Sequence, residues 1–342
     1  MNFHIEELNA HTPASLPALV ELWNLTLGAE FAISVPYLTQ RLTHPPAWPA
    51  ALVQAHIDNH SNNQSVNPND NQASPAGLAL LSAPPAALVS GTGSEPPQIH
   101  VDGLAVHPTY QRRGIGRGLV DWAVRWGKQH HGANLVLGDG PVRLLPGVPV
   151  ATADHPAWAK LNFAPTPATR QDLLCAVASY VPPATVVEIP GVVRPLAPGE
   201  RGYLHNFLET AAPAAQLSLR HFLAQGGRIA DIMGLWTADG LVGAARLVVE
   251  DSVGGIEPWF PYDQPKPWAA LQLITPRQSA PAPLAPTFHA ALLDAALRRL
   301  HNMGVNTCIL DDITESGMTD PQPFADFGFT PYHVYQPFTQ PL

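Results

Sequence analysis

The residues best suited to chemistry lie between positions 104 and 119, where the sequence reads LAVHPTYQRRGIGRGL. Gly114 and Gly116 allow backbone N–H groups to approach an anion closely, and the helix predicted after them adds the positive end of its dipole. Three arginines concentrate positive charge here, in a chain whose net charge is −9: Arg112, Arg113 and Arg117. The segment therefore predicts a diphosphate-binding loop between a strand and a helix.

Two common phosphate-binding motifs do not fit this spacing. A dinucleotide fingerprint, G-x-G-x-x-G, needs glycine where Leu119 stands, and a nucleotide P-loop needs Gly-Lys-Ser or Gly-Lys-Thr, which the chain lacks. What remains is Q-x-x-G-x-G from Gln111 to Gly116, after an apolar strand that ends in His-Pro. The alternative is an ordinary glycine-rich turn.

His100 and Asp102, on the strand before the loop, are the candidates for acid–base chemistry. Period-two alternation predicts that both side chains share a face with Leu104 and Val106. A histidine with its reference pKa of about 6.5 is suited to proton transfer, and a carboxylate can orient it or contact an amine. The alternative is that both are solvated or hydrogen-bonded strand residues without a catalytic role.

The elements that must position these residues occur twice in the chain. The order strand, loop, helix, strand, short helix, strand is found in each half. The matching segments are 101–108 with 269–276, 118–131 with 287–303, 135–139 with 307–311, and 154–165 with 320–331. This order predicts a duplicated α/β domain.

A boundary between the two copies is predicted at the proline-containing segment 180–185. We expect the first domain to span residues 1–182 and the second residues 186–342. Segment 58–75 contains almost no apolar residue, which predicts a flexible surface insertion in a hairpin loop.

Composition excludes several functional classes. The 342 residues include 46% hydrophobic and only 13% charged residues, which favours a folded chain despite 38 prolines. With 18 basic and 27 acidic residues, a nucleic-acid partner is not expected. No apolar run of about 18 residues and no signal-like start is present, and the cysteines number two, so we expect no membrane partner and a cytoplasmic location. The scattered histidines predict no metal site.

The Q-x-x-G-x-G loop after an apolar strand resembles that of the GNAT superfamily, the Gcn5-related N-acetyltransferases. The signature region covers residues 99–163, and the duplicated order is similar to that of tandem-GNAT proteins. The resemblance implies an α/β (α+β) fold of two tandem GNAT-like domains, each a mixed, mostly antiparallel twisted sheet flanked by helices. It also implies acetyl-CoA, or another acyl-CoA, as the cofactor.

The family's binding residues carry over by position. The strand that pairs with the pantetheine arm in the family corresponds here to Leu104, Ala105 and Val106. The loop that binds the pyrophosphate corresponds to Gln111, Arg112, Arg113, Gly114, Ile115 and Gly116, with Arg117 adding positive charge. A carboxylate near Asp102 often acts as the base in this family, which implies that Asp102 and His100 are catalytic.

Two positions depart from the family pattern. The usual general acid is the Tyr of Y-x-x-x-G-F, but this chain has Trp158 there and Asn162-Phe163 in place of Gly-Phe. An indole N–H cannot supply a proton at neutral pH, so the thiolate must be protonated by water or by another residue such as Tyr110. In the second half, segment 277–287 lacks the loop motif and contains three prolines, and Phe324 replaces the Tyr. We therefore expect this degenerate domain to bind no cofactor.

These features together predict an N-acetyltransferase that transfers an acetyl group to a primary amine of a small molecule or peptide, by direct attack on the thioester. The alternative is a catalytically weak or inactive acyl-CoA-binding sensor or scaffold. We expect a monomer, built as a pseudo-dimer of two domains, or a homodimer.

Overall fold

The structure is a computed structural model with two compact units. It describes residues 2–8, 15–43, 49–58, 75–84, 97–138, 144–145, 147–150, 155–167, 169–183, 189–211, 213–224, 226–249, 264–274, 286–310 and 322–342. The first unit comprises Met1–Ala86, Gly93–Ala168 and Gln336–Leu342, and the second Ala87–Thr92 and Thr169–Tyr335. The chain therefore passes from one unit to the other after residue 168 and returns after residue 335, and the boundary expected between residues 182 and 186 is wrong.

The first unit is a mixed sheet with helices on both faces. Its elements are β1 (Phe3–Leu8), α1 (Leu16–Leu27), η2 (Ala29–Phe31), α2 (Val35–Thr43), β2 (Ala50–Ile57), β3 (Gly77–Ser82), β4 (Gln98–Val106), η3 (Pro108–Tyr110), α4 (Ile115–Gln129), β5 (Asn134–Leu137), β6 (Val148–Pro149), α5 (His155–Lys160), β7 (Ala164–Pro165) and β15 (Phe338–Pro341). The strand order is β1-β2-β3-β4-β5-β15-β7. Among the strand pairings described for this sheet, that of β4 with β5 is parallel and the others are antiparallel.

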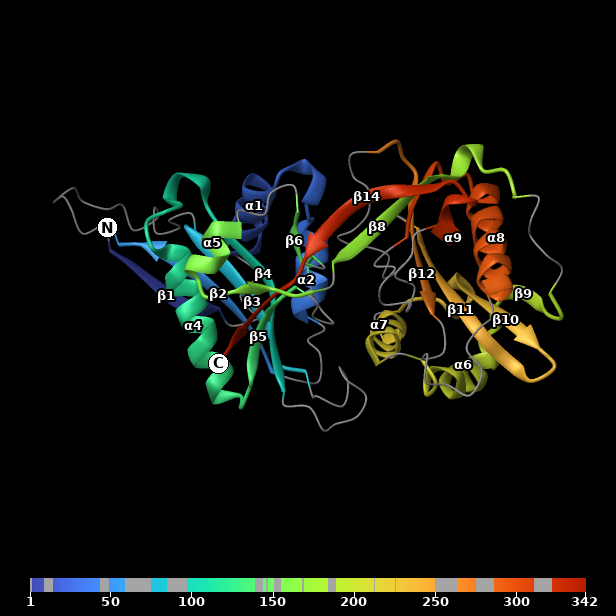
Figure 1. The fold of residues 1–342 in the computed structure, drawn as a ribbon, viewed down its shortest axis with the longest axis horizontal. Helices are drawn as coiled ribbons and strands as arrows, with labels where there is room; N and C mark the ends of the chain where they lie inside the picture. Colours follow the sequence, from blue (N-terminus) through green and yellow to red (C-terminus); the bar gives the residue numbers. More distant parts are fainter. Residues whose placement is uncertain are drawn as a thin grey trace. The chain divides into compact units, whose positions relative to one another are not determined.

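Helices α4 and α5 cover one face of this sheet, and α1 and α2 the other (Figure 1). A Cβ built on Gly77 of β3 would lie 3.0 Å from side-chain atoms of Ile115 and Leu119 of α4. A Cβ on Gly103 of β4 would instead lie 3.1 Å from the ring of Trp23 of α1. The glycines at these two positions let the helices approach the sheet closely from opposite sides.

The helix after the predicted loop has the expected apolar stripe. Leu119, Ala123 and Trp126 of α4 are buried in the core of the first unit, as their i, i+4 and i+7 spacing predicts. The helix begins at Ile115, three residues before the predicted start, because Gly114 adopts the left-handed conformation at its N-cap.

The second unit repeats the order of the main strands and helices of the first. It contains β8 (Arg170–Ala176), η4 (Val177–Ser179), β9 (Val192–Pro195), η5 (Pro198–Glu200), α6 (Arg201–Leu208), α7 (Pro213–Ala224), η6 (Ile229–Asp231), β10 (Ile232–Thr237), β11 (Gly240–Val249), β12 (Trp268–Ile274), α8 (Pro286–Asn302), β13 (Thr307–Leu310), α9 (Gln322–Ala325) and β14 (Phe329–Gln336). Within this unit the strand order is β9-β10-β11-β12-β13-β8-β14, again with one parallel pair, β12 and β13. The predicted fold of two tandem, mixed, mostly antiparallel sheets flanked by helices is confirmed.

The two sheets differ in the origin of one strand. In the first sheet β15, from the end of the chain, lies between β5 and β7, while in the second β8 holds the equivalent place between β13 and β14. The buried Tyr335 hydroxyl of β14 donates to the carboxylate of Asp172 on β8 at 2.8 Å, which fixes β8 within the second sheet. This pairing is the physical reason that the boundary falls before β8.

Several smaller expectations can be compared with the structure. Cys175 and Cys308 are free, and burial raises the pKa of the Cys175 thiol to about 11. No group of three or more metal-binding side chains is found among the residues described. Within the same residues, no helix is both long and apolar enough to cross a membrane. Almost all of the predicted insertion 58–75, namely residues 59–74, lies outside the described part of the chain.

Candidate functional site

A β-bulge in β4 decides which of its side chains face the candidate site. Leu80 of β3 pairs with Gly103, but the next residue, Leu81, pairs with Val101, so Asp102 is the extra residue of β4. Because of this extra residue, Val101 before it and Leu104 after it pack on the same apolar cluster. The predicted alternation is therefore wrong, and His100 does not share a face with Leu104 and Val106.

The bulge separates the two predicted catalytic residues. His100 is only 1% exposed and lies opposite Ser82 on β3 and Val136 on β5. It is not among the residues that line the cavity described below, whereas Asp102, 2% exposed, lines it. Of the two predicted catalytic residues, Asp102 is thus the one that lines the cavity.

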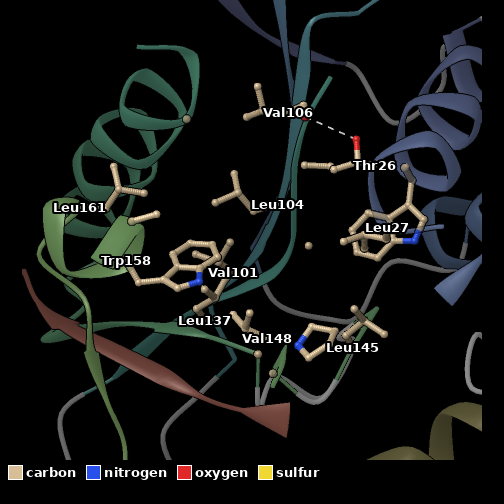
Figure 2. Close-up of a pocket in the computed structure, with 18 of the residues that line it drawn as sticks. Thr26, Leu27, Val101, Leu104, Val106, Leu137, Leu145, Val148, Trp158 and Leu161 are labelled. Atoms are coloured by element: carbon tan, nitrogen blue, oxygen red, sulfur yellow. Dashed lines mark hydrogen bonds between the residues drawn. The ribbon is translucent and has the colours of Figure 1, made fainter. Parts of the chain in front are cut away.

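The cavity begins where the pairing of β4 and β5 ends. Their parallel pairing ends at Val101 and Leu137, and Gly138 N then donates to Val101 O at 3.1 Å. Beyond this point lies a cavity of about 390 Å³, lined by β4 and by the end of β5 (Figure 2). Its walls come from α1 (Trp23, Thr26, Leu27), β4 (Val101–Val106), the loop and α4 (Gln111, Arg112, Gly116), β5 and its end (Leu137, Gly138), residues Leu145 and Gly147–Pro149, and α5 with its C-terminal end (Ala157, Trp158, Leu161).

The glycine-rich loop leads from this cavity into α4. Arg112 has φ 61° and Gly114 φ 91°, and these two left-handed residues turn the chain into the helix. Gly118 N donates to Gly114 O at 2.9 Å and closes the first turn. The N–H groups of the residues between them have no acceptor within the helix, so this end of α4 is a ready site for an anion.

The predicted cofactor residues divide into two groups. Those that line the cavity are Leu104, Ala105, Val106, Gln111, Arg112 and Gly116. Of the remaining four, Gly114 shapes the turn and Ile115 is buried in the core. Arg113 lies over the ring of Tyr110, 6.0 Å from its centroid, and Arg117 donates to the carbonyl of Lys160. Tyr110 itself is not among the lining residues.

Trp158 reaches the cavity from α5 in the place of the expected general acid. Its ring packs edge-on against Phe163, 6.0 Å between centroids, and beside Phe338 of β15 at 5.8 Å. Asn162, which replaces the family glycine, has φ 65°, a conformation that asparagine tolerates better than most residues. Asn162 thus adopts a left-handed conformation at the position of the family glycine, and Trp158 stands at the position of the family tyrosine.

The residues that α1 contributes to the cavity were not predicted from the sequence. Thr26 donates its hydroxyl to Leu22 O at 2.7 Å and lies 3.4 Å from Val106 O, the contact drawn in Figure 2. Trp23 and Leu27 line the same wall. No motif marks these positions, because they lie about 80 residues before β4 and only the packing of α1 on the sheet brings them to the cavity.

The second unit lacks the distortion that opens this cavity. From Ala244 to Val249, β11 pairs with β12 without a register shift, so β12 has no counterpart of the Asp102 bulge over this range. The proline-containing segment 277–287 lies outside the described residues except for its last two, with which α8 begins. The expected absence of a phosphate loop there remains a prediction.

Comparisons with known proteins agree with this geometry. Residues 35–140 match the model of the acetyltransferase (GNAT) family. Among solved structures, the chain is similar to a GCN5-related glucosamine N-acetyltransferase region of a fungal multi-domain GH3 β-N-acetylglucosaminidase, with 15% identity and a TM-score of 0.78. That match covers 99% of this chain but 38% of the fungal protein. The comparison with curated proteins gave no match.

Two further structures match over almost their whole length. A tandem GNAT protein from the clavulanic acid biosynthesis pathway has 18% identity, a TM-score of 0.66 and coverage of 99% of this chain and 98% of its own. A GCN5-related N-acetyltransferase from Sphaerobacter thermophilus has 16% identity, a TM-score of 0.63 and coverage of 99% and 95%. At such identities these matches show the fold alone.

The fold over the length of the chain is that of tandem GNAT structures, with a cavity in the first unit. The match to the GNAT family model covers residues 35–140, within the first unit. This match supports acyl transfer as the class of chemistry, and the GNAT family generally binds acetyl-CoA.

Proposed function

We propose that the protein is an acetyl-CoA-dependent N-acetyltransferase that acts on a primary amine of a small molecule or peptide. The observation that carries the proposal is the cavity at the end of the β4–β5 pairing, beside the N-terminus of α4. A cavity is thereby open at the ends of two parallel strands, where open α/β sheets bind their ligands, and it reaches an anion-binding helix end.

The residues present fit the cofactor. The backbone N–H groups at the start of α4 and the guanidinium of Arg112 are donors suited to a diphosphate, and Gln111 is held near them by its bond to Val106 O at 3.2 Å. Beyond the bulge, β4 offers backbone groups and the apolar side chains of Leu104 and Val106 to an extended pantetheine arm. When bound, the cofactor supplies an electrophilic thioester carbonyl and a thiolate leaving group.

Asp102 is the group of this chain best placed to handle the proton of the acceptor. An alkylammonium has a pKa of about 10.4 and must lose a proton before it can attack a carbonyl. Asp102 lines the cavity at the point where β4 bulges, and it is 2% exposed. In the proposed reaction it accepts the proton from the amine nitrogen.

Replacing Asp102 with Asn tests this role. We expect Asp102→Asn to lower kcat by at least about 100-fold, because an amide cannot accept the amine proton. The affinity for CoA, measured by titration calorimetry, is expected to stay close to that of the wild type, since Asp102 lies apart from the phosphate loop. His100→Asn is the matched control on the same strand: it is expected to lower the melting temperature and to leave kcat nearly unchanged. The assignment fails if the two variants exchange these effects.

An acyl-CoA-binding sensor or scaffold is the second candidate, and Trp158 favours it. The expected general-acid position holds an indole that cannot donate a proton at neutral pH, and Tyr110 does not line the cavity. In the transferase proposal the departing thiolate takes its proton from water or from Asp102. The sensor instead retains CoA binding and has no turnover.

Trp158→Tyr separates the two candidates. For a transferase we expect kcat to rise by about 10-fold or more, because the phenol restores a proton donor at the cavity wall. Trp158→Phe provides an aromatic ring without the hydroxyl and is expected to give no increase. Free-thiol release from acetyl-CoA, followed with a panel of amines, measures both variants. CoA binding without turnover in the wild type and in both variants would establish the sensor instead.

The proposal includes a small-molecule amine acceptor and a cytoplasmic location. It also includes a chain that acts as a monomer or homodimer, without nucleic-acid or membrane partners. The low charge density and net charge of −9 support this choice of partners.

A further inference from the structure

The wall that α1 gives to the cavity is apolar because the polar groups of this helix are bonded within the chain. Trp23 donates its indole N–H to Phe31 O at 2.8 Å, and Thr26 donates to Leu22 O. The side-chain amide of Asn24 donates to Ile33 O at 3.0 Å and accepts from Ile33 N at 2.8 Å. The helix therefore presents the ring of Trp23 and the side chain of Leu27 to the cavity.

The described residues on the remaining walls of this side are also mostly apolar. Leu145, Val148 and Pro149 close the cavity below α1, and Figure 2 shows Leu27 across β4 from Trp158. Among the described lining residues with polar side chains, Gln111 and Arg112 belong to the phosphate loop and Thr26 bonds its own helix. Asp102 is the acidic residue of this lining.

We propose that the acceptor is a small primary monoamine with an apolar body, and this inference rests on the transferase function proposed above. The amino group lies toward Asp102, and the apolar body packs against Trp23 and Leu27. A hydroxyl-rich amino sugar or a polyamine would bring polar groups into contact with these walls without partners for them, and each unpaired group lowers affinity.

An acceptor panel tests the inference with the full chain and acetyl-CoA. Phenethylamine represents the apolar monoamines, glucosamine the amino sugars and spermidine the polyamines, and free-thiol release measures turnover. We expect kcat/KM for phenethylamine to exceed that for glucosamine by at least about 100-fold, because several hydroxyls of the sugar stay unpaired.

Two variants of α1 connect this preference to the wall. Leu27→Gln places an amide at the cavity and is expected to reduce the preference for phenethylamine over glucosamine by about 10-fold. Leu25→Gln is the matched control, since Leu25 lies on the same helix, is 55% exposed and does not line the cavity. This control is expected to leave the preference unchanged. CoA affinity, measured separately, is expected to be unaltered in both variants.

The possible outcomes separate this inference from the function on which it rests. Equal or faster turnover of glucosamine or spermidine overturns the inference while leaving the transferase in place. If Leu27→Gln has the same preference as the wild type, the wall formed by α1 does not select the acceptor. That result overturns the inference as well. CoA binding without turnover of any amine contradicts the transferase proposal, and the inference with it.

Discussion

Gly114→Asp is expected to weaken CoA binding by at least about 100-fold. Gly114 has φ 91° at the N-cap of α4, where a non-glycine residue is strained by about 1–2 kcal/mol. Space does not limit the substitution, because the atom nearest to an added Cβ is Phe3 Cε1 at 3.9 Å. The main effect is electrostatic: a carboxylate at the helix end repels the diphosphate that this end would otherwise attract. Titration calorimetry with CoA measures the loss.

Two control variants separate charge from backbone strain. Gly114→Asn has the same size and the same left-handed backbone but no charge, so we expect it to lose much less affinity than Gly114→Asp. Gly304→Asp introduces a carboxylate at another left-handed glycine, with φ 77° and no atom within 4 Å, in the second unit. It is expected to bind CoA normally. Normal binding by Gly114→Asp would mean that the assigned loop is wrong.

Deleting residues 338–342 is expected to abolish CoA binding, although these residues lie more than 200 positions after the loop. The deletion removes β15 from its place between β5 and β7. It also removes Phe338, which is 1% exposed and packs beside Trp158 at the cavity wall. Loss of one such buried ring costs about 3–5 kcal/mol, and a domain has a total stability of roughly 5–15 kcal/mol.

The second unit provides an internal control for this truncation. Its sheet keeps β8 and β14, so its thermal transition is expected to remain while that of the first unit shifts to lower temperature. Phe338→Ala retains the β15 backbone and is expected to give an intermediate loss of stability, with CoA binding recovered at low temperature. A truncated chain with wild-type CoA affinity would show that the first sheet does not need β15.

Several features of this molecule could be predicted from local sequence. Glycines and arginines in Q-x-x-G-x-G indicate an anion site because backbone freedom and charge act within a few residues. The apolar spacing of Leu119, Ala123 and Trp126 specifies a helix face in the same way. The repeated order of strands and helices can likewise be recognised from the sequence, and both units of the structure contain it.

The bulge was not predictable from one strand alone. The order of residues from His100 to Val106 is consistent with uninterrupted alternation, and only pairing with β3 shows that Asp102 is the extra residue. That one residue turns the later side chains to the other face, which leaves Asp102 at the cavity and His100 away from it.

By itself, the sequence determined the phosphate-type loop, the helix behind it, the duplication and the missing tyrosine, since each depends on neighbouring residues. The tertiary structure alone decided the position of Asp102, the apolar wall of α1, and the placement of β8 and β15. These three depend on contacts between residues that are distant in the chain, and such contacts are set by strand pairing and packing that no local pattern encodes.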